Sequence, residues 1–159
     1  RLKERVKLDP MFTTPWIVVP GIVSGAAYAS GDAMGDKFTI NVPRAGILRS
    51  AEVWDQDKEQ LAFDILLFED DFTATADNSA MDVTDSEGVK FLDAVRVEIA
   101  DYLAFNDNAA AVVHKIDLVY ALKGTAPTGI FHCQCVTRGA PNYAAATDLA
   151  IRFHIEQRA

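Results

Sequence analysis

The stretch Leu149-Ala150-Ile151-Arg152-Phe153-His154-Ile155-Glu156 places a large apolar side chain at every second position. The positions between them hold Arg152, His154 and Glu156. A period of two is that of a β-strand with one buried face and one solvated face. The stretch therefore predicts a half-buried strand, and it indicates the class of fold to which the rest of the chain belongs.

The same alternation, or a short apolar run between turn residues, recurs along the chain. It predicts about eight strands. The clearest of these are residues 37–42, 47–53, 61–68, 95–99, 115–122, 130–136 and 149–155. We interpret residues 47–68 as a hairpin, because a polar cluster separates two apolar segments. Its second strand is apolar on both faces apart from Asp64, which is typical of a strand covered on both sides by core or by a partner subunit.

One short helix is expected next to the acidic, turn-rich segment 69–88. Its predicted range is residues 85–93. Asp82 or Thr84 is suited to cap the first turn, and Glu87 follows Thr84 at the spacing of a capping box.

These segments together predict an all-β fold in a single domain. We expect an antiparallel two-sheet sandwich, jelly-roll-like, with one short helix and an extended amino-terminal arm. Three prolines and two glycines interrupt the first 25 residues, so no long helix is expected there. The arm is assigned to residues 1–20 and the β-sandwich domain to residues 21–159.

Charge is unevenly distributed. Residues 1–9 contain four cations and two acids, whereas residues 10–159 contain 11 cations and 21 acids. Such a body repels phosphate groups, so nucleic acid is not an expected partner. The arm is either a solvated tail or a basic segment that docks on an acidic neighbouring subunit. In the second interpretation the candidate partner-binding residues are Arg1, Lys3, Arg5, Lys7, Phe12 and Trp16.

No apolar stretch approaches the roughly 20 residues that span a bilayer, so no membrane contact is expected. No apolar segment of a secretion signal follows the first charges. Cys133 and Cys135 fall on one face of a predicted strand, a geometry that disfavours a disulfide between them. They are expected to be reduced, buried thiols, because a zinc site would need about four ligands and no second pair exists.

Each candidate catalytic or metal-binding site lacks a required partner residue or the required spacing of its residues. His114, His132 and His154 lie on separate predicted strands, without the His-x-His pattern of metal-binding cupins. Acidic segment 69–88 offers oxygen ligands without the spacing of a calcium loop, so a solvated loop is favoured and divalent-ion binding stays open. No nucleophile elbow or phosphate loop is present. The sequence predicts that the chain is not an enzyme and has no catalytic residues, metal site or cofactor.

Two segments carry a family likeness. One is DILLFEDDFTATADNSAMD (residues 64–82), and the other is TRGAPNY (residues 137–143) followed by Asp148 and Leu149. They resemble a group of small tailed-bacteriophage virion proteins, with an LLLF-x-x-DFTATADNAAFD-like stretch in mid-chain and an SRG-x-P-x-Y segment before a closing strand. The likeness covers roughly residues 20–157.

The resemblance implies a structural role. Members of the group look like capsid decoration, or cement, proteins that sit as homotrimers over capsomer junctions and stabilise the shell. It implies the major capsid protein and further copies of the chain as partners, and a place on the capsid surface of the virion after synthesis in the host cytoplasm. A phage tail or baseplate protein and a host-glycan-binding β-sandwich module are the alternatives.

Overall fold

The structure is a computed structural model that describes residues 10–158, and it contains two antiparallel sheets. Its strands in chain order are β1 (Met11–Thr13), β2 (Ile17–Val18), β3 (Ala33–Pro43), β4 (Ala45–Asp55), β5 (Phe63–Phe68), β6 (Phe91–Val97), β7 (Tyr102–Ala104), β8 (Ala109–Val113), β9 (Leu118–Ala121), β10 (Thr128–Thr137) and β11 (Leu149–Gln157). One short α-helix, α1 (Asp85–Gly88), and one 3₁₀ turn, η1 (Ile99–Asp101), complete the elements. The predicted all-β, two-sheet sandwich class is confirmed.

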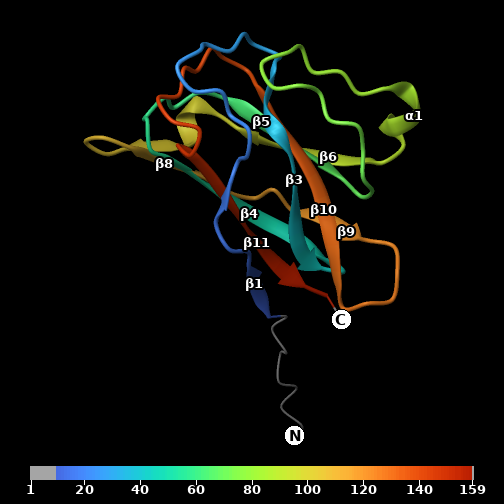
Figure 1. The fold of residues 1–159 in the computed structure, drawn as a ribbon. Coiled ribbons are helices and arrows are strands. Elements are labelled where there is room, and N and C mark those ends of the chain that lie inside the picture. Colours follow the sequence, from blue (N-terminus) through green and yellow to red (C-terminus); the bar gives the residue numbers. More distant parts are fainter. Residues whose placement is uncertain (1–9, 159) are drawn as a thin grey trace, which may run out of the picture.

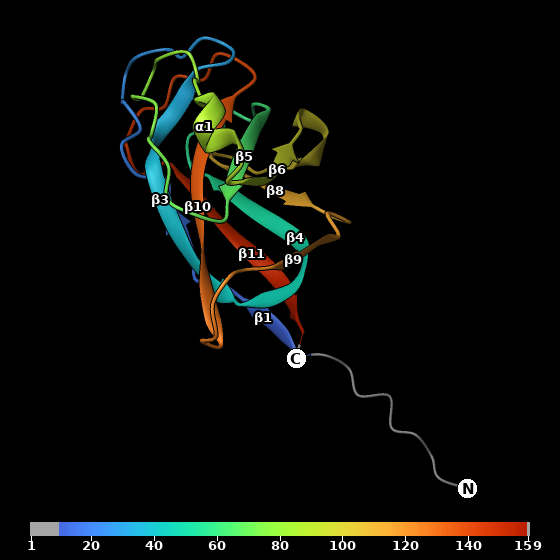
Figure 2. The ribbon, with the colours of Figure 1, turned by 90° about the vertical axis from the view of Figure 1, so that its right-hand side faces the viewer.

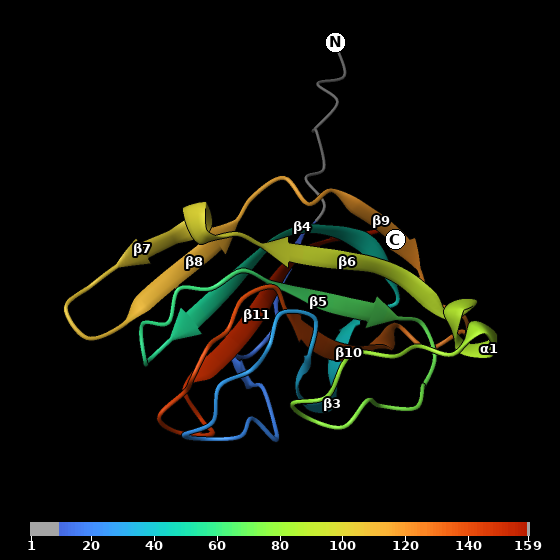
Figure 3. The ribbon, with the colours of Figure 1, turned by 90° about the horizontal axis from the view of Figure 1, so that it is seen from above.

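The larger sheet has seven strands in the order β1-β11-β4-β8-β7, with β2 also paired to β11 and β9 also paired to β4. The smaller sheet has the order β3-β10-β5-β6. The two sheets appear as separate layers in Figures 1 and 2, and Figure 3 shows β5 and β6 lying across β4 and β11. Their facing sides supply one continuous core.

Alternation along the strands builds that core. Ile151, Phe153 and Ile155 of β11 are fully buried, as their spacing predicted. Phe131 of β10 packs its ring edge-on against Phe153, with the ring centroids 6.5 Å apart, so the two sheets meet at this contact. Phe131 also meets Tyr120 of β9 edge-on, with the ring centroids 4.7 Å apart.

The predicted hairpin over residues 47–68 is wrong. β4 belongs to the seven-stranded sheet and β5 to the four-stranded sheet, so the polar cluster between them is a corner that connects two layers. Lys58 and Gln60 adopt the left-handed conformation there. The buried Asp55 carboxylate accepts hydrogen bonds from the backbone N–H of Gln60 at 2.8 Å and of Asp57 at 3.2 Å. This side chain fixes the corner, and apolar alternation alone gave no sign of it.

The predicted continuous strand over residues 115–122 is also wrong. Lys115 and Asp117 have positive φ, which breaks the alternating stretch before β9 begins. The break lets β8 and β9 pair with different halves of β4 along the same edge. β8 itself was missed, because its sequence, AAAVV, has no polar-apolar alternation.

Helix α1 is shorter than the predicted range of residues 85–93. Thr84 is its N-cap residue, as predicted, but its hydroxyl makes no capping hydrogen bond to the backbone. The Glu87 carboxylate instead accepts a hydrogen bond from the backbone N–H of Thr73 at 2.7 Å. Glu87 therefore ties the helix to the preceding loop.

Part of the expected arm is incorporated into the larger sheet. Residues 1–9 lie outside the described residues. β1 and β2 both pair with β11. Between them the buried Thr14 hydroxyl accepts the backbone N–H of Phe153 at 2.9 Å. Two segments of the expected arm, β1 and β2, are thus strands of the sandwich. No helix in the described part of the chain is long and apolar enough to cross a membrane.

Two glycines allow a matched test of backbone packing. Gly35 and Gly25 both have positive φ, at 76° and 70°, where a side chain is strained. A Cβ atom at Gly35 would lie 2.4 Å from the carbonyl oxygen of Pro20, whereas nothing lies within 4 Å of one at Gly25.

We predict that Gly25→Ala lowers the free energy of unfolding by about 1–2 kcal/mol, the usual strain of a left-handed residue. Gly35→Ala should cost clearly more, because the steric overlap adds to the same strain. Urea denaturation of both variants measures this difference. Equal losses would show that the contact with Pro20 does not constrain the fold.

Candidate functional site

An apolar row crosses the outer face of the seven-stranded sheet. Strand register aligns Val18 with Ala150, Ala150 with Trp54, Trp54 with Ala110, and Ala110 with Leu103. Residues in register on neighbouring antiparallel strands project from the same face. The next residues along, such as Ile151 and Val53, face the core instead. We call the row, together with Trp16 and Phe105, the apolar strip.

Aromatic rings extend the strip at both ends. Phe105 lies against Trp54, with the ring centroids 6.1 Å apart. At the other end the guanidinium of Arg152 lies over the Trp16 ring, 4.5 Å from its centroid. Four of the strip's large side chains are strongly exposed: Trp16 (44%), Val18 (45%), Leu103 (64%) and Phe105 (47%). A contiguous exposed apolar patch of this kind is typical of an interaction surface.

The strip contains a hollow of about 400 Å³. It is lined by Trp16, Val18, Trp54, Gln56 and Ala150. Two indole rings and two aliphatic side chains give it an apolar lining with one amide. Such a lining suits an apolar side chain or a sugar ring, and it offers no group that could act as an acid, base or nucleophile.

A polar group lies beside the strip. The Glu52 carboxylate pairs with Arg152, and it lies 3.3 Å from Nε2 of His154. Burial raises the pKa of Glu52, but the hydrogen bonds from Arg152 and His154 outweigh burial and leave the pKa below its ordinary value. Nδ1 of His154 lies 2.9 Å from the Thr13 hydroxyl of β1. These charges are paired within the chain, so the face is close to neutral.

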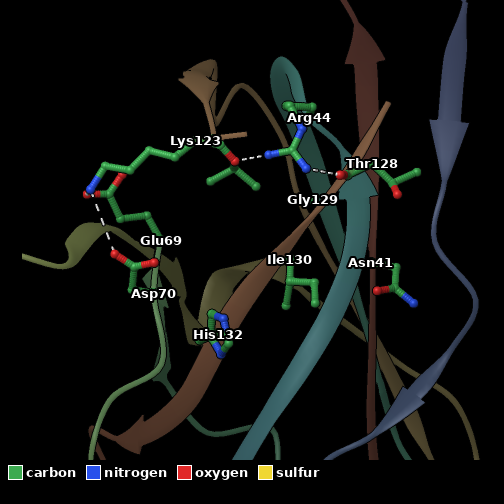
Figure 4. A pocket seen from close by; sticks show the side chains of 10 residues that line it. Asn41, Arg44, Glu69, Asp70, Lys123, Thr128, Gly129, Ile130 and His132 are labelled. Carbon is green, nitrogen blue, oxygen red and sulfur yellow. Dashed lines mark hydrogen bonds and ion pairs between the residues drawn. The ribbon is translucent and has the colours of Figure 1, made fainter. Parts of the chain in front are cut away.

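A second hollow of about 310 Å³ lies against β3 and β10 (Figure 4). Lys123 spans it to reach Glu69 at 3.5 Å and Asp70 at 3.8 Å. The Arg44 guanidinium donates its hydrogen bonds to the backbone carbonyls of Lys123, Ala126 and Thr128. Because these donors are committed to the chain's own turn, Arg44 is not free to hold an anionic ligand. We interpret this hollow as the base of the turn between β9 and β10.

One buried carboxylate links two distant parts of the sequence. Asp64 of β5 is 2% exposed and accepts hydrogen bonds from Nε of Arg96 at 2.9 Å and from Nε of Arg138 at 2.7 Å. Burial raises the pKa of Asp64, but the two guanidinium groups together hold it below the usual range. The pair Asp64–Arg138 also joins the two segments that carry the family likeness.

Asp77 has a similar structural role in the loop after β5. Its carboxylate accepts hydrogen bonds from the Tyr28 hydroxyl at 2.7 Å and from the backbone N–H groups of Gly35 and Val23 at 2.6 and 3.2 Å. The predicted solvated loop is wrong for this part of segment 69–88, because Asp77 and Phe72 are bound to the body. Phe72 is 3% exposed and stacks on Phe68, with the ring centroids 4.0 Å apart.

The structure separates the residues predicted to bind a partner. Arg1, Lys3, Arg5 and Lys7 lie outside the described residues. Phe12 is partly buried and packs against the chain's own core, whereas Trp16 is exposed in the apolar strip. Sequence reasoning missed Val18, Trp54, Leu103 and Phe105. The alternation of β11 indicated which of its side chains face outward. The strand pairing was needed to show that Val18, Trp54 and Leu103 lie on the same face.

The cysteine and histidine positions are now defined. Cys133 and Cys135 are free and fully buried, which confirms the predicted core thiols, and burial raises the pKa of both. His132 lies on β10, 3.7 Å from Asp71, whereas His154 lies on the other sheet. No group of three or more histidine, cysteine or acidic side chains in residues 10–158 is arranged to hold a metal ion.

Comparisons with known proteins found no relative of this chain. No family model matches the chain, and searches of curated proteins and of solved structures also found no match.

The hydrogen bonds from Arg96 and Arg138 to Asp64 give a prediction with a defined pH dependence. Asp64→Asn should lower the free energy of unfolding by about 1–3 kcal/mol at pH 7, because it removes charged hydrogen bonds from a buried acceptor. The folded-state pKa is depressed, so this stabilisation is present above the unfolded pKa of about 3.9 and is lost as pH falls through the folded value.

Urea denaturation of wild type and variant between pH 8 and pH 2.5 measures the effect. The difference should be constant down to about pH 5 and shrink below about pH 4, where the unfolded carboxyl group protonates. Asp71→Asn, which alters an exposed ion pair with Lys37, is the control and should change stability little. A difference that persists undiminished at pH 2.5 would contradict the assignment.

Proposed function

We propose that this chain is a structural protein of a tailed-phage virion, and that it acts as a capsid decoration protein that binds over capsomer junctions and stabilises the shell. In this proposal it works by binding rather than by catalysis. Its partners are the major capsid protein and further copies of itself, as a homotrimer in the form that the resemblance implies. Its place is the capsid surface of the virion.

The observation that carries the proposal is that the two family-like segments form one structural unit. β5 pairs with β10 along its whole length, which aligns Asp64 with Val136 and Phe63 with Thr137. Arg138, from the second segment, then reaches Asp64 in the first. The two segments are far apart in sequence but in contact in space. The likeness therefore supports a shared fold more strongly than two separate matches would.

The apolar strip supports a binding role. A decoration protein stabilises a shell by burying surface between subunits, which requires shape and apolar contacts rather than a perturbed acid or base. Tryptophan side chains are among the residues that contribute most to such interfaces, and the strip contains both tryptophans of the chain.

A binding assay on phage heads tests the proposal. Purified protein added to heads that lack it should co-sediment with them and should raise the temperature at which the shells release their DNA. Dye access to the DNA during heating measures that release. Binding confined to detached tails would favour the tail or baseplate alternative and would end the decoration proposal.

The basic segment gives a separate prediction. Gln157 donates its backbone N–H to the carbonyl of Pro10 at 3.0 Å, so the first described residue lies beside the end of β11. We predict that deletion of residues 1–9 weakens head binding severalfold while circular dichroism and unfolding stay unchanged. The deletion must stop before β1, because β1 and Thr14 belong to the larger sheet.

Salt titration of head binding provides the control for the deletion of residues 1–9. If the four cations contact an acidic capsid surface, the wild type should lose affinity more steeply with rising salt than the deletion does. Equal affinity and equal salt dependence would show that the segment is not a docking arm.

The glycan-binding alternative has one observation in its favour, the hollow between Trp16 and Trp54. Tryptophan rings stack on sugar rings, and the Gln56 amide could hydrogen-bond a hydroxyl group. Quenching or shift of tryptophan fluorescence by host-surface oligosaccharides, absent in Trp54→Ala, would favour this reading over decoration.

A further inference from the structure

The two arginines that hold Asp64 keep further hydrogen-bond donors. Arg96 donates to the Asp64 carboxylate from Nε at 2.9 Å and from Nη2 at 3.3 Å, and Arg138 donates from Nε at 2.7 Å. Each guanidinium group has five N–H donors, so most of the donors on Arg138 make no hydrogen bond within residues 10–158. The side chains of Arg96 and Arg138 are 61% and 43% exposed. The fold therefore uses one side of each guanidinium group.

The two guanidinium groups line a hollow of about 270 Å³. Its other lining residues are Ala62 and Glu98. The buried Asp64 carboxylate holds both groups in place before any ligand arrives, so little ordering of their side chains is needed on binding. Fixed, planar guanidinium donors are suited to a carboxylate, which accepts two parallel N–H bonds. We call Arg96 and Arg138 the arginine pair.

The arginine pair lies beside an open sheet edge. β6 pairs with β5 on one side and with no strand on its other side in the described part of the chain. Such an edge presents backbone N–H and C=O groups with which an extended segment can pair. Arg96 is itself a residue of β6, in register with Asp64 of β5. A segment that pairs with β6 would therefore pass next to the arginine pair.

Charge determines which kind of segment this edge accepts. The unused guanidinium donors select an anionic group. The exposed Glu98 lines the same hollow and disfavours further negative charge close by, and the net charge of −8 repels polyanions such as nucleic acid. A single carboxylate on an extended segment meets both conditions.

The acidic segment 69–88 of the chain itself does not block this approach. Helix α1 lies where β6 begins, whereas Arg96 lies near the end of β6 (Figure 3). The acids and the arginine pair are thus separated along the strand. A partner's carboxylate reaches the arginine pair without facing the part of the chain that would repel it most.

We propose that the β6 edge and the arginine pair bind an extended segment of a partner protein, a segment that carries an acidic side chain. The segment adds as a further strand beside β6, and its carboxylate accepts hydrogen bonds from the unused donors of Arg96 and Arg138. In the particle this segment belongs to the major capsid protein, an assignment that rests on the proposed function. Each copy has its own β6 edge, so the contact is compatible with a homotrimer.

A peptide titration without phage heads tests the site. The probe is the capped heptapeptide Thr-Val-Thr-Glu-Thr-Val-Thr, and the control peptide has glutamine in place of glutamate. In NMR spectra of the labelled chain, the glutamate peptide should shift the backbone amides of β6 and the Nε–H signals of Arg96 and Arg138. The glutamine peptide should bind about tenfold more weakly, because it lacks the charged acceptor.

Three variants test the role of charge and geometry. Arg96→Lys and Arg138→Lys each keep a cation for Asp64 but remove the planar donors, so each should raise the dissociation constant of the glutamate peptide about tenfold. Glu98→Gln should lower it severalfold, because it removes a like charge from the hollow.

A matched control uses an arginine whose donors are committed within the chain. Arg49 donates to Asp117 and Glu156, so Arg49→Lys should leave peptide binding unchanged. Circular dichroism and urea denaturation of every variant control for folding. Glu98 is exposed, so Glu98→Gln tests the site even if an arginine variant unfolds.

Two results would overturn the proposal. One is the absence of shifts on β6 with the peptide at about 1 mM, where even a weak specific site is occupied. The other is equal affinity for the glutamate and glutamine peptides.

Head binding separates this inference from the decoration role. Arg138→Lys should weaken head binding severalfold. A chain that binds the peptide but not heads would refute only decoration, and a chain that binds heads but not the peptide would refute only the β6 site. Peptide binding together with unchanged head binding by Arg138→Lys would overturn the assignment of the segment to the capsid protein.

Discussion

The side chain of Gln134 holds together much of the smaller sheet's outer side. It is fully buried on β10, and its amide donates to the carbonyls of Gly35 at 3.0 Å and Thr75 at 2.7 Å. Its carbonyl oxygen accepts the backbone N–H of Thr75 at 3.1 Å. A buried amide is costly unless its donors and acceptor are used, and here three hydrogen bonds use them. The loop after β5 is thereby fixed across the sheet, and Phe72 and Asp77 follow it onto the body.

The way each strand is covered explains which parts of the fold could be predicted from the sequence. β11 and β3 were predictable because each has one core face and one polar face. β5 was identified as a strand covered on both sides. The fold shows that Phe72 covers Phe68 at one end of its outer side and that Arg96 and Arg138 cover Asp64 at the other. The corner at Asp55 and the break at Lys115 were not predictable, since both depend on hydrogen bonds to residues whose positions only the pairing of β4 defines.

The family-like segments acquire a physical meaning from the same contacts. The buried Asp64 carboxylate pairs with the partly exposed Arg138, Asp77 orders the strand and loop around Tyr28, and Tyr143 is almost fully buried. These are side chains whose replacement would disturb folding. A likeness at such positions informs us mainly about architecture, and a partner surface has to be sought among residues that the fold does not use, such as Leu103 and Phe105.

The distribution of charge gives the two outer faces opposite properties. Acidic side chains gather on residues 69–93, where Asp71, Asp82 and Asp85 are exposed, and a surface of one sign keeps like molecules apart there. The apolar strip lies on the other sheet and has its nearby charges paired. An acidic chain that associated through its acidic side would have to overcome that repulsion, whereas association through the strip does not. In any association between copies, long-range repulsion would therefore disfavour the acidic side, and burial of apolar surface would favour the strip.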